Sequence, residues 1–267
     1  MQNLKMPAMF IGHGSPMNAL AKNDYSKFLN QTGRRIPKPK AILAVSAHWE
    51  THGTQVLNAI QPKTIHDFGG FPDELFKIQY PAKGAPEVSS RVAELLKTDN
   101  AQLTAEWGLD HGTWSVLVHL YPAAEIPVLQ LSLNRKLKLR EHYELAQKLI
   151  PLRNEGVLIL GSGNITHNLR ALNWDSNSKA FAWALQFDEL IKKAIIEKNL
   201  PCLFNEISAD QSLWNQALPT LEHYLPLLYI LGAAEASESP KFIYEEMQMG
   251  SLSMRSVEMS NGPLGPI

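Results

Sequence analysis

Residues 41–49 read Ala-Ile-Leu-Ala-Val-Ser-Ala-His-Trp, an apolar run that gives way to small residues and then to a histidine. A short continuous apolar run of this kind is typical of a strand that is buried on both faces of a parallel sheet. We therefore predict a buried strand over Ala41–Val45, with His48 just beyond its carboxyl end.

The same pattern recurs along the chain and alternates with helical spacing of apolar residues. Further strands are expected at Ala8–Ile11, Pro127–Leu131 and Val157–Leu160, and amphipathic helices at Pro86–Lys97 and Leu139–Leu149. Strands that alternate with helices predict an α/β fold with a central, mostly parallel or mixed sheet that is flanked by helices. Since neither repeats nor a linker are evident, we expect one catalytic domain over residues 1–267.

The C-terminal third is expected to contain two more helices and a strand pair. Ala180–Lys198 has the pattern of a long amphipathic helix, and Leu221–Ala234 that of a buried helix which Pro226 must either start or kink. Two strands, Lys241–Glu246 and Ser251–Glu258, are predicted around a turn at Met249 and Gly250.

Composition excludes several classes of partner. The 267 residues carry a formal net charge of −1, so no basic footprint for nucleic acid or for an anionic membrane is visible, and we expect a small-molecule partner. Cys202 is the one cysteine, which excludes an intramolecular disulfide and any cysteine-rich metal site. Since no signal-peptide pattern or membrane-length apolar stretch is present, a cytoplasmic location is expected.

Four histidines share one local setting, in which an apolar segment meets small or turn-forming residues. His13 lies in Gly-His-Gly-Ser-Pro, His48 in Ser-Ala-His-Trp, His167 in Gly-Ser-Gly-Asn-Ile-Thr-His-Asn and His223 in Glu-His-Tyr-Leu-Pro. Imidazole is the commonest protein ligand for transition metals, and the carboxyl ends of strands converge on one crevice in an open α/β sheet. We interpret the four as one metal site; the alternative is that each is a separate capping or core residue.

Six motifs in order resemble a known family. They are Gly-His-Gly-Ser-Pro (12–16), Ser-Ala-His-Trp (46–49), Ile-His-Asp-Phe-Gly-Gly-Phe-Pro (65–72), Asp-His-Gly-Thr-Trp (110–114), Gly-Asn-Ile-Thr-His-Asn-Leu (163–169) and Glu-His-Tyr-Leu-Pro-Leu-Leu (222–228). Together they resemble the 4,5-DOPA dioxygenase branch of the class III extradiol ring-cleavage dioxygenases. The resemblance implies one divalent metal ion, with Fe(II) for ring cleavage and Zn(II) in some members, and a catechol and O2 as substrates.

The resemblance also implies roles for individual residues. His13, His48 and His223 correspond to metal ligands, and His167 to an acid–base histidine that lies close enough to become a fourth ligand of zinc. His111 corresponds to a histidine that hydrogen-bonds substrate or oxygen. Related enzymes complete the ligand set with a carboxylate, so Glu222 is an alternative to His223; if both lie on a helix, their side chains diverge and only one can reach the ion. We favour His223, with Glu222 as a carboxylate in the first turn of the helix.

The remaining histidines and the tryptophans have other expected roles. The loop around His66 contains two glycines and two aromatic residues and is either a lid over a flat ring or a loop packed at the domain edge. His52, His119 and His142 are expected to be solvated or structural. The tryptophans Trp49, Trp107 and Trp114 either wall an aromatic pocket or pack in the core.

Three functions remain open from the sequence. The first is extradiol cleavage of a catechol such as DOPA, with His167 and His111 as catalytic residues. The second is a zinc hydrolase, because a histidine site with an open position also activates water. The third is a metal-binding protein of the same fold without catalysis.

Overall fold

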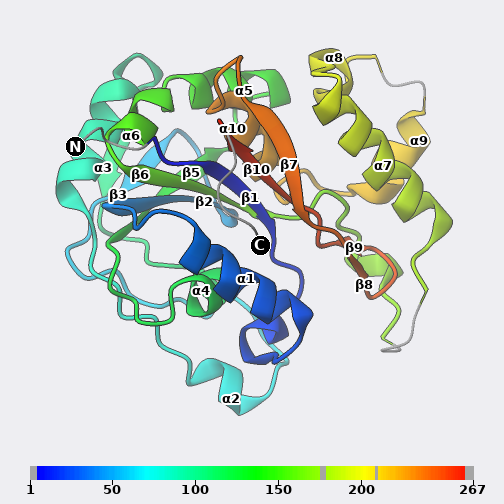
Figure 1. Cartoon of the computed structure of the whole chain (residues 1–267), viewed down its shortest axis with the longest axis horizontal. Coiled ribbons are helices and arrows are strands. Elements are labelled where there is room, and N and C mark those ends of the chain that lie inside the picture. The colour runs from blue at the N-terminus through cyan, green and yellow to red at the C-terminus, as the bar shows by residue number, and fades with distance from the viewer. Residues whose placement is uncertain (1–4, 175–178, 208–209, 262–267) are drawn as a thin grey trace.

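An eight-stranded sheet forms the centre of the computed structural model, which describes residues 5–174, 179–207 and 210–261 (Figure 1). Its strands, in spatial order, are β4 (Gln102–Thr104), β3 (Gln55–Leu57), β5 (Val128–Asn134), β2 (Ala41–Thr51), β6 (Val157–Gly163), β1 (Ala8–Gly12), β10 (Ser256–Ser260) and β7 (Ser239–Tyr244). The four central strands β5, β2, β6 and β1 are mutually parallel, whereas β3 runs antiparallel to β5 and β10 lies antiparallel between β1 and β7. The predicted α/β fold with a mostly parallel, mixed sheet is confirmed.

Helices cover both faces of this sheet. One face packs against α1 (Asp24–Arg35) and α4 (His111–Leu120), and the other against α3 (Pro86–Leu95), α5 (Leu139–Gln147), α7 (Ala182–Ile196) and α10 (Leu225–Gly232). Successive side chains of a strand point to opposite faces, so Phe10 contributes to the core under α10 while Met9 and Ile11 contribute to the core under α4. The shorter helices are α2 (Asp73–Phe76), α6 (Ile150–Asn154), α8 (Leu200–Leu203) and α9 (Gln211–Ala217).

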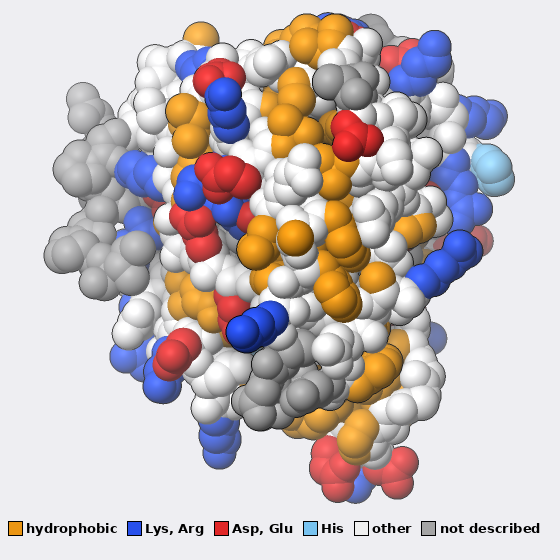
Figure 2. Space-filling view, turned by 90° about the vertical axis from the view of Figure 1, so that its right-hand side faces the viewer, with side chains coloured by type: hydrophobic (Ala, Val, Ile, Leu, Met, Phe, Trp, Pro, Cys, Tyr) orange, Lys and Arg blue, Asp and Glu red, His pale blue; other side chains and the backbone are white. Residues whose placement is uncertain are grey.

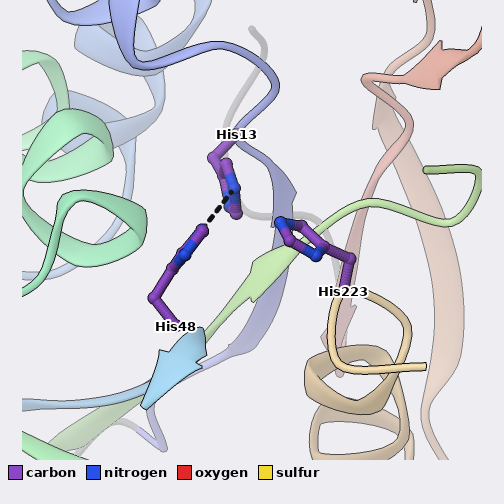
Figure 3. Close-up of side chains that lie close together, drawn as sticks. All are labelled: His13, His48 and His223. Carbon is purple, nitrogen blue, oxygen red and sulfur yellow. Dashed lines mark hydrogen bonds between the residues drawn. The ribbon is translucent and has the colours of Figure 1, made fainter. Parts of the chain in front are cut away.

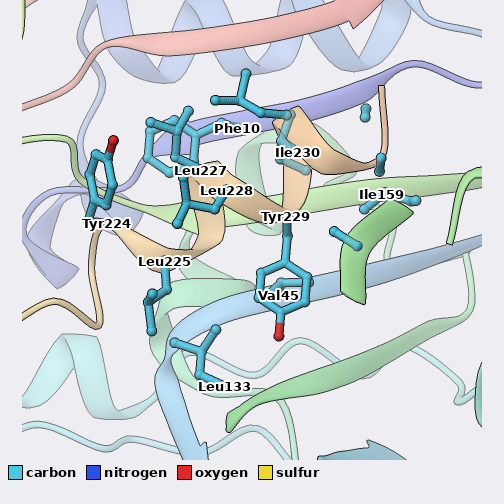
Figure 4. Packing of buried hydrophobic residues seen from close by; sticks show 14 of the residues in the cluster. Phe10, Val45, Leu133, Ile159, Tyr224, Leu225, Leu227, Leu228, Tyr229 and Ile230 are labelled. Carbon is cyan, nitrogen blue, oxygen red and sulfur yellow. The ribbon is translucent and has the colours of Figure 1, made fainter. Parts of the chain in front are cut away.

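Helix α10 is apolar on all sides because it is enclosed by the sheet and by α5. Its residues Leu227, Leu228 and Ile230 are fully buried and pack over Phe10 and the neighbouring strands (Figure 4). A helix without a polar face is expected at such a position. Burial of α10 fixes the turn that precedes it, which carries His223.

Several predicted boundaries are wrong. Strand β2 continues to Thr51 instead of ending at Val45, and α10 begins at Leu225, not at Leu221. Pro226 lies in the first turn of α10, where its fixed φ and missing N–H are tolerated, so it starts the helix and does not kink it. The short strands β3 and β4 were not predicted, since three residues give no readable alternation.

The C-terminal strand pair is present but interrupted. Met249 and Gly250, with φ of 52° and 77°, form the predicted turn between β8 (Met247–Gln248) and β9 (Leu252–Ser253). The run predicted as one strand over 251–258 is divided between β9 and β10, and the pairing of β10 with β7 shifts register beside Val257.

A buried ion pair ties the C-terminal strands to the rest of the fold. The Arg153 guanidinium, fully buried in α6, forms two hydrogen bonds of 2.6 Å with the Glu238 carboxylate and also donates to the backbone oxygens of Met6, Ala233 and Met259. Burial raises the pKa of Glu238, but the hydrogen bonds from Arg153, from the backbone N–H of Glu235 and from Lys5, together with the Arg153 charge, outweigh burial and hold the pKa below its usual value. Glu238 is therefore ionised in the folded protein at neutral pH.

Removing this charge should destabilise the fold. We expect Glu238→Gln to lower the free energy of unfolding at pH 7 by about 3 kcal/mol, because the Arg153 charge then stays buried without its counterion. Since the pKa of Glu238 is lowered on folding, its contribution is present above the unfolded-state pKa and is lost as pH falls through the folded-state pKa. Urea unfolding at a series of pH values should show the difference from wild type shrinking in acid; an unchanged difference would contradict this assignment.

Charged side chains of both signs are interspersed with apolar ones on the face shown in Figure 2. Within residues 5–174, 179–207 and 210–261, no helix is long and apolar enough to cross a membrane.

Candidate metal centre

Three histidines from distant parts of the sequence meet at the carboxyl edge of the central strands (Figure 3). His13 directly follows β1, His48 lies in the last part of β2, and His223 lies in the turn before α10. Their ring centroids are 5.0–5.3 Å apart, and Nε2 of His13 lies 3.2 Å from Nε2 of His48. One nitrogen from each ring lies within 4.8 Å of the other two, so a single ion could bind all three.

Local backbone features bring the three residues together. The pairing of β2 with β5 is irregular between Val45 and Glu50, so the strand passes His48 with its side chain at the sheet edge. Gly163 ends β6, and a Cβ there would lie 2.1 Å from the carbonyl oxygen of His223. The turn that carries His223 therefore rests directly on the end of β6, which only glycine permits. Gly112 is required for a similar reason, because a Cβ there would lie 2.8 Å from the His48 ring.

The donor set fits a divalent transition metal. Nδ1 of His13 lies 2.9 Å from Ser162 Oγ, Nδ1 of His223 lies 3.1 Å from a Glu222 carboxylate oxygen, and Nδ1 of His48 lies 3.3 Å from an Asp67 carboxylate oxygen. Because the Ser162 hydroxyl donates to Gly112 O, it accepts from His13 Nδ1–H. Metal-binding histidines typically donate one N–H to an oxygen in this way, which leaves the Nε2 lone pair for the ion.

Burial keeps these imidazoles neutral. It is the largest cause that lowers the pKa of His13 and His223 well below the usual value and that of His48 to about 3, and neighbouring histidines add to the effect. A neutral imidazole is the form that binds a metal. The centre is therefore ready for a cation at neutral pH.

Two further histidines adjoin the three. His167, just beyond β6, stacks on His223 with ring centroids 3.4 Å apart and an interplanar angle of 8°. His111, the first residue of α4, lies 3.8 Å from His48 between ring centroids. Burial lowers the pKa of His167 to about 4, so its ring is neutral at neutral pH. All five histidines that the sequence assigned to the site are thus brought together.

Glu222 differs from its expected place. It was predicted in the first turn of a helix, but α10 begins three residues later, so Glu222 and His223 share a turn and no helical divergence separates them. The Glu222 carboxylate accepts from Thr220 Oγ1 at 2.9 Å and contacts His223 Nδ1. In this arrangement the carboxylate contacts Nδ1 of His223 and leaves Nε2 free for the ion. This supports the choice of His223 as the metal ligand.

The other histidines lie outside this group. His66 donates from Nε2 to Ile78 O and packs against Phe68 and Trp114, so its ring belongs to the interior of its own loop. His142 is buried against the Tyr229 hydroxyl. His119 bonds Asn18 O, and His52 is exposed, in keeping with the structural and solvated roles expected for them.

Trp49 and Trp114 pack in the interior, and Trp107 lies partly buried beside them. Trp49 and Trp114 are buried, and Trp49 stacks in parallel on Trp107 at 5.9 Å. The Trp107 indole donates to the carboxylate of Asp110, the residue that caps α4 just before His111. Core packing, and not the wall of a pocket, is the role that these contacts show for Trp49 and Trp114.

Sequence reasoning missed the oxygen atoms that orient the histidines. Ser162 lies in Gly-Ser-Gly and Asp67 in Ile-His-Asp-Phe, where the neighbouring glycines and His66 are the more conspicuous residues. The signal that could have identified Asp67 is a carboxylate directly after a histidine, in a motif outside any predicted helix.

Comparison with known proteins agrees with this geometry. Residues 7–255 match the family described as the catalytic LigB subunit of aromatic ring-opening dioxygenase. The chain is 43% identical over 265 residues to the 4,5-DOPA dioxygenase extradiol of Escherichia coli K12, covering 97% of this chain and 96% of that protein. It is 38% identical over 258 residues to the protein of the same name from Beta vulgaris, covering 94% and 96% of the two chains.

A solved structure supports the same relationship. The crystal structure of an uncharacterised Escherichia coli K12 protein superimposes with a TM-score of 0.83 at 40% identity, covering 96% of this chain and 100% of the other. The fold and the histidine cluster define a metal-dependent enzyme built at the edge of a parallel sheet. The chain belongs to the LigB family of aromatic ring-opening dioxygenases, and its class is that of the extradiol enzymes.

Proposed function

We propose that this chain opens the ring of a catecholic substrate such as DOPA by 4,5-extradiol cleavage with O2, using Fe(II) held by His13, His48 and His223. The observation that carries the proposal is the convergence of one nitrogen each from His13, His48 and His223, whose Nδ1 atoms lie 2.9–3.3 Å from oxygen atoms, with two more histidines beside them. A site that only stores a metal needs neither of the two additional histidines, His167 and His111. The whole of residues 1–267 acts as one cytoplasmic catalytic domain in this proposal.

When bound, Fe(II) would supply open positions at which the two adjacent catechol oxygens and O2 meet and exchange electrons. The ring of His167 is neutral at neutral pH and has a free nitrogen lone pair, and in this proposal it accepts a phenolic proton and returns it later in the reaction. His111, whose ring centroid lies 3.8 Å from that of His48, contacts substrate or oxygen in this proposal. His167, whose ring stacks on that of His223, is the candidate fourth ligand if Zn(II) replaces Fe(II).

Oxygen uptake tests this proposal directly. The protein, reconstituted with Fe(II) without air and then exposed to O2 with a panel of catechols including DOPA, should consume O2 and form a yellow semialdehyde acid with a new visible absorption band. Zinc-loaded protein should be inactive in the same assay. Amide hydrolysis by the zinc form would favour the hydrolase alternative, and tight metal binding without any turnover would favour a non-catalytic metal-binding role.

A further inference from the structure

The Asp67 carboxylate lies between two histidines that have different proposed tasks. Its Oδ2 is 2.9 Å from Nδ1 of His111 and 3.3 Å from Nδ1 of His48, and its Oδ1 accepts the backbone N–H of His111 at 2.8 Å. The side chain is only 16% exposed. One carboxylate thus contacts the ring of a proposed ligand and both the ring and the backbone of a proposed substrate-contacting residue.

The loop that carries Asp67 is fixed at its base. Ile65 N donates to Leu109 O at 2.7 Å, and the buried Trp114 indole donates to Ile65 O at 2.8 Å. The His66 ring closes the loop on itself through Ile78 O, and Phe68 packs edge-on against His111 at 5.3 Å. These contacts hold the Asp67 carboxylate in a defined position, as a mobile lid would not.

An ionised carboxylate has acceptors only, so the hydrogen that points at it must come from the imidazoles. The Asp67 carboxylate accepts both the ring Nδ1–H of His111, at 2.9 Å, and its backbone N–H, at 2.8 Å. His111 therefore carries hydrogen on Nδ1, and the same carboxylate oxygen, 3.3 Å from Nδ1 of His48, favours hydrogen on Nδ1 of that ring as well. In this tautomer the lone pair of each ring lies on Nε2. For His48 that lone pair is the metal-binding one, and for His111 it is an acceptor for a substrate hydroxyl.

We propose that Asp67 is a positioning residue that sets the tautomer and orientation of His48 and His111 at once, and so couples metal affinity to substrate alignment. The proposal rests on the proposed metal centre and ring-opening function. An amide cannot replace the carboxylate, because one of its two polar atoms is a donor and would face an N–H group. Outer-sphere partners of this kind typically contribute 10- to 100-fold to metal affinity or activity.

The test compares Asp67→Asn with the matched control Asp73→Asn, which changes an exposed carboxylate in the same segment at the start of α2. Asp67→Asn should weaken Zn(II) binding, measured by chelator competition, by about 10- to 100-fold, while the melting temperature of the metal-free protein stays near that of wild type. Asp73→Asn should leave both quantities unchanged. Because Zn(II) affinity needs no turnover, this result does not depend on whether catechols are the substrate.

A double-mutant cycle with His111→Gln separates positioning from a general structural effect. Asp67→Asn should lower kcat/KM for the best catechol in the wild-type background, but by less than about twofold once His111 is already glutamine, whereas its effect on Zn(II) affinity should be the same in both backgrounds. Unchanged Zn(II) affinity in Asp67→Asn, or fully additive losses in kcat/KM, would overturn the proposal.

Discussion

His167→Gln should retain Fe(II) and catechol binding while turnover falls by roughly 10²–10⁴. Glutamine preserves approximate size and one hydrogen bond but cannot accept and return a proton. This substitution is informative because His167 stacks on His223 but is not one of the three histidines, His13, His48 and His223, whose nitrogens converge. Steady-state oxygen uptake and the metal content of the same preparation give the two quantities required.

The matched control for this variant is His52→Gln. This histidine is exposed and lies directly after β2, so its replacement should leave turnover near that of wild type. Loss of Fe(II) from His167→Gln would show that His167 is chiefly a ligand, and the acid–base role would then pass to His111. A near wild-type rate with full metal would contradict the proton-transfer role altogether.

The sheet could be predicted because its central strands have a strong local signal. Ala41–Val45 and Val157–Leu160 are buried on both faces, so the requirement for apolar residues applies at every position and not at alternate ones. The start of α10 could not be placed from apolar spacing, since Leu221 continues the pattern although the chain there forms a turn. Helix ends depend on capping and on tertiary contact, which here is the approach of His223 O to Gly163.

The histidines of the site could be predicted for a topological reason. Residues that follow different parallel strands meet at one edge of the sheet, so His13, His48 and His167 were expected to converge, and the structure places them together. Asp67 could not be found in the same way, because its loop reaches the centre from outside the run of parallel strands and is held there by Trp114 and Leu109. Long-range contacts of this kind leave no periodic trace in the sequence.

The metal content of His223→Ala and Glu222→Ala, each reconstituted with Fe(II) without air, tests the three-histidine centre most directly. His223→Ala should lose stoichiometric Fe(II), because only two of the three facing nitrogens remain. Glu222→Ala should still bind one ion with an affinity lowered by about 10- to 100-fold, since it loses only the carboxylate that holds Nδ1 of His223. The exposed His52→Ala variant serves as the control and should bind like wild type. Full Fe(II) in His223→Ala together with its loss in Glu222→Ala would contradict the account and make Glu222 the third ligand.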